Sequence, residues 1–209
     1  QPLVQEPNWV AQPPVLPSLR AVARVTWERM YEGVYDGLLG LDVADPAADR
    51  LLEDEIFEHT ADLTPRQRVQ RIHRWVTDNV EPADGAFFQS APLMLAARRG
   101  SRSRVMRYLF ERAGLSARIV YARALGGEQP VEGAPDADVY DATLVMVTLP
   151  EGPVFLSSLG RGVAHDYLVP GLRGQDAIVI EPGLRHVTLP EAQGTPSSQT
   201  FAGTVDIAP

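Results

Sequence analysis

A cluster of arginines surrounds Gly100, at the expected start of a helix, and these side chains are the best suited in the chain to hold a charged ligand. A helix N-terminus has unpaired backbone amides and a dipole that favours negative charge. Guanidinium groups bind carboxylates and phosphates in paired geometry. The cluster contains Arg98, Arg99, Arg102, Arg104 and Arg107. We expect an acidic protein or peptide segment to bind at Arg99, Ser101, Arg102 and Arg104.

The same arginines have a structural alternative. The chain carries 27 acidic residues against 19 basic ones, so each arginine could find a partner within the domain. Candidate acids lie at residues 53 to 55 and 136 to 141. In that case the arginines belong to the scaffold, and the sequence leaves both roles open.

His165 and Asp166 form a second candidate pair, because a histidine oriented by an acid can activate a serine nucleophile. On a strand, however, adjacent side chains point to opposite faces, so the two residues would not form a base with its orienting group. His73 lies beside the apolar stripe of an expected helix, which indicates a structural role. The four histidines lack a metal-binding spacing, so no metal or other cofactor is expected.

Composition excludes several classes of function. The chain has no cysteine, which excludes disulfides and thiolate metal sites. A net charge of −8 argues against a nucleic-acid partner, because such binding depends on a basic surface that neutralises phosphates. A length of 209 residues, 44% of them hydrophobic and 22% charged, fits one compact domain. Since there is no apolar run of about 18 residues, we expect no membrane insertion by this segment.

Helices are expected in the first half of the chain, where apolar residues recur at helical spacing. The best case begins after Thr64, because Pro65 suits a first helical turn and Gln67 completes a capping box. Gly114 is expected to end the last helix. The expected helices cover residues 18 to 39, 46 to 59, 65 to 80, 92 to 98 and 102 to 113.

Strands are expected in the second half, as apolar runs bounded by glycine and proline at residues 118 to 124, 138 to 149, 154 to 158 and 177 to 181. Helices followed by strands predict an α+β fold, with N-terminal helices packed on a C-terminal antiparallel sheet. The expected division is an extended linker at residues 1 to 17, a domain at 18 to 190, and a polar tail or lead into another domain at 191 to 209.

The segment from Thr64 to Arg123 resembles the bacterial transglutaminase-like superfamily, in particular the branch whose core follows an N-terminal β domain in larger extracytoplasmic proteins. Residues 109 to 118, Leu-Phe-Glu-Arg-Ala-Gly-Leu-Ser-Ala-Arg, are similar to the family pattern Leu-Leu-x-x-x-Gly-Leu-x-Ala-Arg. The resemblance implies a papain-like core, a periplasmic or otherwise extracytoplasmic location, and a Cys-His-Asp triad.

The resemblance also indicates which residues occupy the triad positions. The cysteine position falls on Arg99 when counted back from the glycine of this pattern, or on Arg102 when Gly100 is matched to the family's Gly-Asp-Cys. The histidine position falls on Ala142 and the aspartate position on Ser157. At each of these positions the side chain differs from the one that serves the family there as nucleophile, base or orienting acid in covalent acyl transfer. We expect the three positions to converge at a vestigial cleft.

Two functions from different classes follow. The preferred one is a catalytically inactive transglutaminase-like domain that serves as a protein-binding or structural module within a larger protein. The alternative is a hydrolase or acyltransferase in which a serine replaces the family cysteine and His165 is the base. The candidate nucleophiles are Ser101, Ser103, Ser157 and Ser158.

Overall fold

The structure is a computed structural model that describes residues 26 to 83, 86 to 127, 139 to 158, 160 and 163 to 193. The expected linker, the first turns of the first expected helix, most of the loop at 126 to 136 and the polar tail from residue 194 onward lie outside these ranges. Among the described residues, no helix is long and apolar enough to span a membrane.

The first helical region follows the prediction with shorter elements. Helix α1 (Trp27–Leu41) begins at Thr26, whose hydroxyl accepts a hydrogen bond from the Arg29 amide. Helix α2 (Pro46–Leu51) begins at Asp45 and continues as a π-helical turn, η1 (Leu52–Ile56). The predicted helix to residue 59 therefore ends three residues early, and the two residues at positions 58 and 59 have φ angles of 50° and 54°.

The helices α3 (Pro65–Asn79) and α5 (Arg102–Arg112) form the centre of the molecule. The capping box predicted at Thr64 and Gln67 is present, because each side chain bonds the other residue's backbone amide. Between them lie three short elements and one further helix: β1 (Glu81–Pro82), η2 (Ala86–Phe88), α4 (Ala91–Ala97) and β2 (Arg99–Gly100). Strands β1 and β2 pair in parallel, which fixes the chain just before α5 against the chain just after α3.

The second half forms one antiparallel sheet of five strands, in the order β5-β4-β3-β6-β7. A short 3-10 turn, η4 (Pro170–Leu172), precedes β6. The last strand was not predicted, because it is short and three of its four residues are exposed. The strands are β3 (Ser116–Ala122), β4 (Ala142–Leu149), β5 (Gly152–Ser157), β6 (Asp176–Val179) and β7 (Arg185–Thr188).

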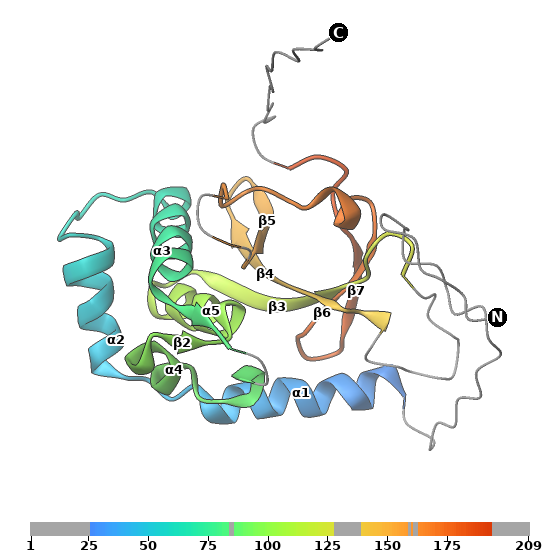
Figure 1. Ribbon diagram of the computed structural model, residues 1–209, viewed down its shortest axis with the longest axis horizontal. Coiled ribbons are helices and arrows are strands. Elements are labelled where there is room, and N and C mark those ends of the chain that lie inside the picture. Colours follow the sequence, from blue (N-terminus) through green and yellow to red (C-terminus); the bar gives the residue numbers. More distant parts are fainter. Residues whose placement is uncertain (1–25, 84–85, 128–138, 159, 161–162, 194–209) are drawn as a thin grey trace, which may run out of the picture.

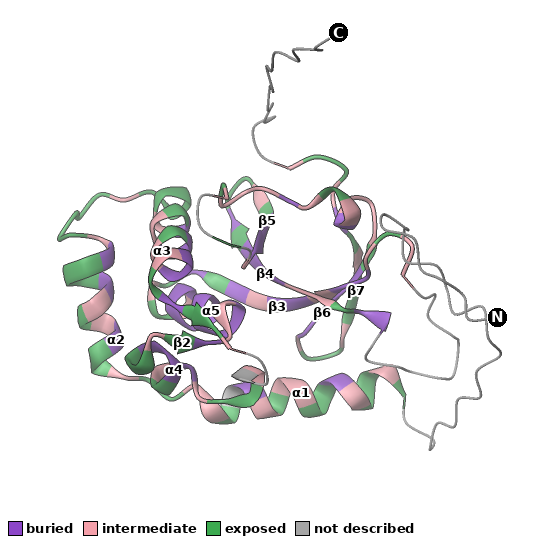
Figure 2. Ribbon diagram, viewed as in Figure 1, coloured by how far each residue is buried: buried purple, intermediate pink, exposed green. Residues whose placement is uncertain are grey.

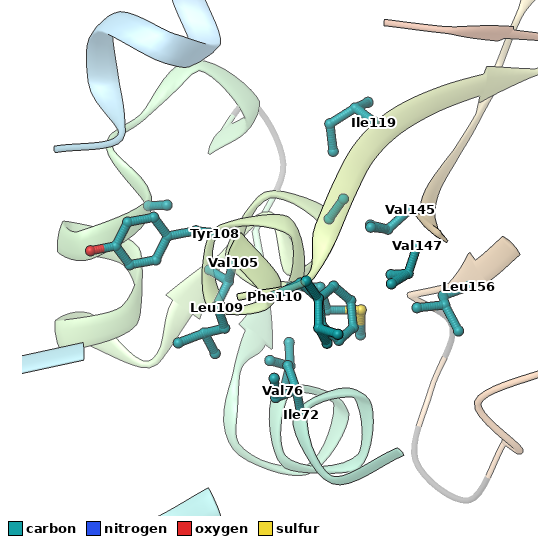
Figure 3. Close-up of a cluster of buried hydrophobic side chains, with 14 of the residues drawn as sticks. Ile72, Val76, Val105, Tyr108, Leu109, Phe110, Ile119, Val145, Val147 and Leu156 are labelled. Carbon is teal, nitrogen blue, oxygen red and sulfur yellow. The ribbon is translucent and has the colours of Figure 1, made fainter. Parts of the chain in front are cut away.

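The sheet is buried on both faces, and each face has its own apolar cluster (Figures 1 and 2). On β4, Val145 and Val147 pack against the helices, together with Phe110 of α5 (Figure 3). The intervening Leu144 and Met146 belong to the second cluster, on the opposite face, which includes residues from the segment that precedes β6. Alternate residues of a strand therefore serve two different cores.

Candidate functional site at the start of helix α5

The chain enters α5 through a turn that only glycine can make. Gly100 has a φ of 149°, and a Cβ at this position would overlap the side chain of Met94 on α4. The next residue, Ser101, caps the helix by accepting a hydrogen bond from the Arg104 amide at 3.4 Å. The Ser101 hydroxyl also lies 3.1 Å from that of Ser103. Some of the hydrogen-bonding groups at the start of α5 are therefore satisfied by the Ser101 and Ser103 side chains of the same segment.

Arg102, the first residue of α5, joins the helix to its neighbours. Its guanidinium donates to the carbonyl oxygens of Val80 at 2.7 Å and Thr77 at 2.9 Å, both near the end of α3. A longer hydrogen bond of 3.4 Å reaches the carbonyl oxygen of Ser158, just after β5. Because the last carbonyls of a helix lack partners within it, a cation is well placed there. Arg102 thus braces three elements.

Arg104 and Arg107 point to the other side of α5 and meet one buried acid. The side chain of Asp42 is only 5% exposed, and its two carboxylate oxygens accept hydrogen bonds from the two guanidinium groups. Arg104 is fully buried and donates a further hydrogen bond to the Phe87 carbonyl. Burial lowers the pKa of Arg104, and Asp42 opposes this shift. Arg104 therefore serves the fold in place of the predicted ligand contact.

The two arginines before Gly100 differ from each other. The Arg98 guanidinium lies over the Trp75 ring at 4.4 Å from its centroid and pairs with Glu55 at 3.1 Å, as expected for a partner within residues 53 to 55. Arg99 is exposed, and its side chain makes no ion pair with the described residues. Arg99 is therefore the member of the predicted ligand site that remains open to a partner.

The predicted triad positions share one end of the sheet but not one face. Ala142 pairs with the last residue of β3, and Ser157 pairs with Leu144, so both lie at the end of the sheet that Arg102 approaches. However, Ala142 packs against the second apolar cluster, to which Leu144 also belongs. Strand alternation thus directs both side chains away from α5. The side chains of Ala142 and Ser157 therefore do not converge with Arg99 or Arg102 on a common cleft, contrary to the prediction. On β4 it is Thr143, paired with Tyr121, that faces the helices.

His73 and His165 meet at a hollow beside the end of β5. His73 is 2% exposed, and its Nε2 lies 2.9 Å from the Ser157 carbonyl oxygen, to which it must donate. Burial lowers the pKa of His73, against the opposing effect of this hydrogen bond. We call this cavity of about 520 Å³ the histidine hollow; its lining is Gln70, His73, Arg74, Thr77, Asp78, Val163, Ala164 and His165.

His165 lies in a turn and not on a strand. Because the turn does not impose opposite side-chain directions, its Nδ1 comes within 3.9 Å of the Asp166 carboxylate. Its Nε2 is buried and has no hydrogen-bond partner among the described residues. Burial lowers the pKa of His165, and Asp166 opposes the shift. Because His73 and His165 are far apart in the chain, no sequence pattern indicates that they line the same hollow.

The serine candidates do not meet this histidine. Nε2 of His165, the nitrogen that would act as base, has no serine hydroxyl within hydrogen-bond distance in the described part of the chain. His73 contacts the carbonyl oxygen of Ser157 and not a nucleophilic hydroxyl. Ser101 contacts a backbone amide and Ser103. In the same described part, no three His, Asp or Glu side chains gather closely enough to hold a metal ion.

No known protein family matches this sequence, and no curated protein matches it. A solved structure from Parabacteroides distasonis, described as a "putative protease", has a TM-score of 0.57 at 10% identity and covers 78% of this chain and 31% of that larger chain. A "putative cysteine protease" from Cytophaga hutchinsonii has a TM-score of 0.42 at 15% identity and covers 82% of this chain and 60% of that one. At 10% identity, the likeness to the first of these structures is evidence about the fold and not about activity. The predicted fold class, α+β with N-terminal helices packed on a C-terminal antiparallel sheet, is confirmed by the architecture.

Proposed function

We propose that this chain is a catalytically inactive transglutaminase-like domain, which acts as a protein-binding or structural module within a larger protein. One observation carries the proposal: both candidate positions for the family's nucleophile, Arg99 and Arg102, hold an arginine, and the guanidinium of Arg102 bonds the carbonyl oxygens of Thr77 and Val80. An arginine remains protonated at any physiological pH and has no lone pair to attack a carbonyl carbon. The chain has no cysteine elsewhere to take over this role.

The surroundings of α5 support the same conclusion. A helix start that activates a thiol must leave its amides and dipole directed at that thiol. Here Ser101 accepts from one of these amides. The residue of β4 that faces the helices at this end is Thr143, which cannot act as a general base. The contacts around this helix start stabilise the fold, and they contain no group that would transfer a proton.

The alternative is a hydrolase with a serine nucleophile, and one observation favours it. His165 has a carboxylate beside Nδ1 and an unpartnered Nε2, which is the arrangement of a general base with its orienting group. What this arrangement lacks is a hydroxyl in reach of Nε2. A serine could serve only if the chain around Ser158 moved toward His165.

Labelling with a fluorophosphonate separates the two functions, because this probe reacts with serine only where a base activates it. The purified chain is incubated with the probe and its intact mass is measured. We expect no adduct on wild-type protein or on His165→Gln. A single adduct on a serine, lost in His165→Gln and retained in the exposed-histidine control His186→Gln, would replace the proposal with the hydrolase.

A further inference from the structure

The histidine hollow joins two parts of the fold that are far apart in sequence. On one side, α3 contributes His73, which hydrogen bonds the end of β5. On the other side, the turn at residues 163 to 167 contributes His165, which is 12% exposed. The two rings are close enough to influence each other electrostatically. The turn therefore faces α3 through one buried and one largely buried imidazole, next to the 3.9 Å ion pair of Asp166 with Arg66 of α3.

Both imidazoles are held as neutral groups. For His73, the hydrogen bond to a carbonyl requires the proton on Nε2, so Nδ1 carries the lone pair of the neutral ring. For His165, the nearby carboxylate favours the proton on Nδ1, which leaves a buried lone pair on Nε2. Among the described residues, no carboxylate is hydrogen bonded to either ring, because Asp166 lies 3.9 Å from Nδ1 of His165. A proton added to either ring would create a buried cation.

The charges that surround the two rings include both signs. Arg74 and Asp78 of α3 line the hollow, and Asp78 favours a charged His73. Arg102, from α5, disfavours it. For His165, Asp166 favours the charged ring and Arg66 disfavours it. Arg66 is itself paired with Glu151 at 3.0 Å and lies 3.9 Å from Asp166. Asp78 and Asp166 therefore offset only part of the free-energy cost of protonating the two neighbouring imidazoles. The largest part of that cost is desolvation of the charged rings.

We propose that this pair of histidines is an acid-sensitive contact, which holds the turn at residues 163 to 167 against α3 at neutral pH and releases it when both rings become protonated. Release moves His165 into water, where its charge is solvated, and separates it from His73. The hollow then opens on the side of the turn, while the sheet and the α5 contacts are unaffected. The inference concerns the fold itself and does not depend on which of the two proposed functions holds.

The direction of the effect follows from the two pKa shifts. Both pKa values lie below the ordinary histidine value of 6.5, so the closed contact binds fewer protons than the open one. The contact is fully stable above pH 6.5 and is lost as the pH falls through the lowered pKa values. Each histidine changes the closed-to-open ratio by about tenfold per pH unit over the range in which only the open state is protonated.

Hydrogen exchange followed by mass spectrometry tests this contact directly. Exchange of the segment containing residues 163 to 169 is measured at pH 7.5 and pH 5.5 and corrected for the intrinsic pH dependence of exchange. We expect protection of this segment to fall on acidification by up to about tenfold per pH unit for each histidine, and to stay below that of the β3 and β4 segments at both pH values, because the turn opens without unfolding of the sheet. Equal protection of the segment at both pH values, or exchange of the segment only together with β3 and β4, would overturn the proposal.

Two variants assign the effect to the histidines. In His165→Gln the titrating ring is removed, and in His73→Gln an amide remains that can still donate to the Ser157 carbonyl. Each should reduce the pH-dependent loss of protection, and His59→Gln, at a residue whose side chain is 69% exposed, should leave it unchanged. An unchanged loss in both buried-site variants would overturn the assignment. If a variant fails to fold, NMR titration of the wild-type imidazoles gives the answer: His73 and His165 should titrate below the ordinary histidine pKa of 6.5, and titration at or above that value would contradict the proposal.

Discussion

The molecule has two buried polar regions, one around Asp42 beside α5 and one in the histidine hollow beside α3. They offset the free-energy cost of burying polar groups in opposite ways. Around Asp42, two buried guanidinium groups share one buried carboxylate, so every ion has an opposite charge at hydrogen-bond distance. In the histidine hollow, the buried groups avoid charge by remaining neutral. The first region balances its charges against one another, whereas the second avoids charge until the pH falls below the ordinary histidine pKa of 6.5. The difference separates a fixed part of the scaffold from a responsive one.

The largest effect is expected from removing the shared acid. Asp42→Asn leaves Arg104 and Arg107 without their buried counter-charge, and breaking such a pair costs about 3 to 5 kcal/mol. Urea unfolding measures the loss. The matched control is Asp49→Asn, because the pair of Asp49 with Arg112 is partly exposed and should contribute about 0 to 1 kcal/mol. Equal losses in the two variants would show that the Asp42 cluster is not a buried ion network.

Removing the brace should cost less. Arg102→Ala deletes hydrogen bonds from a charged donor to Thr77, Val80 and Ser158, and we expect a destabilisation of about 1.5 to 3 kcal/mol. Thermal unfolding measures it, with Arg29→Ala on the exposed face of α1 as the control. If Arg102→Ala melts with the wild type and instead abolishes binding to an acidic peptide, Arg102 belongs to a ligand site and not to the scaffold.

The pH dependence of global stability should identify the responsive region. Because burial lowers the pKa values of His73 and His165, the unfolded chain takes up protons first, and stability declines as the pH falls below 6.5. The slope contributed by each histidine is up to about 1.4 kcal/mol per pH unit. Urea midpoints between pH 7.5 and pH 5 measure it. A smaller slope in His73→Gln is expected, and the same slope as wild type would contradict the origin assigned here.

The smallest effect is expected at Arg99, the exposed arginine of the predicted ligand site. Arg99→Ala should change stability by no more than about 0.5 kcal/mol, as is usual for a surface substitution. The more informative measurement on Arg99→Ala is its affinity for a glutamate-rich peptide at low and high salt. Binding that weakens in Arg99→Ala, and not in Arg29→Ala, would support the acidic partner expected from the sequence. Equal binding by both variants would remove Arg99 from that site.

The local structure around α3 and α5 could be predicted because its signals are local. The capping box at Thr64 and the turn at Gly100 depend on residues that are neighbours in the chain. The orientation of the strands could not be predicted in the same way. On β4 the residues at positions 144 to 147 are all apolar and alternate between the two cores, so the sequence does not distinguish the face that carries Ala142 from the face that carries Thr143. A shift of one residue then reverses the side chain assigned to the cleft.

The partners of the buried charges were also beyond the reach of sequence patterns. Asp42 lies 62 residues before Arg104 and follows α1 in an irregular segment. No local pattern there indicates which acidic residue will be buried. Of the predicted acids at residues 53 to 55, Glu55 pairs with Arg98. His165 and Asp166 are neighbours in the chain, but the approach of their side chains depends on a turn closed by a hydrogen bond from the Tyr167 amide to the Ala164 carbonyl. The partners of the buried arginines are decided by long-range packing.

The central claim is that the start of α5 is part of the scaffold and performs no chemistry, and a transamidation assay tests it most directly. The chain is incubated at pH 7.5 with a glutaminyl peptide and a primary amine, and the peptide mass is followed over many hours. We predict that the peptide remains unmodified, with neither amine incorporation nor hydrolysis of the glutamine amide. Product that accumulates with wild-type protein and is absent with Ser101→Ala would contradict the account.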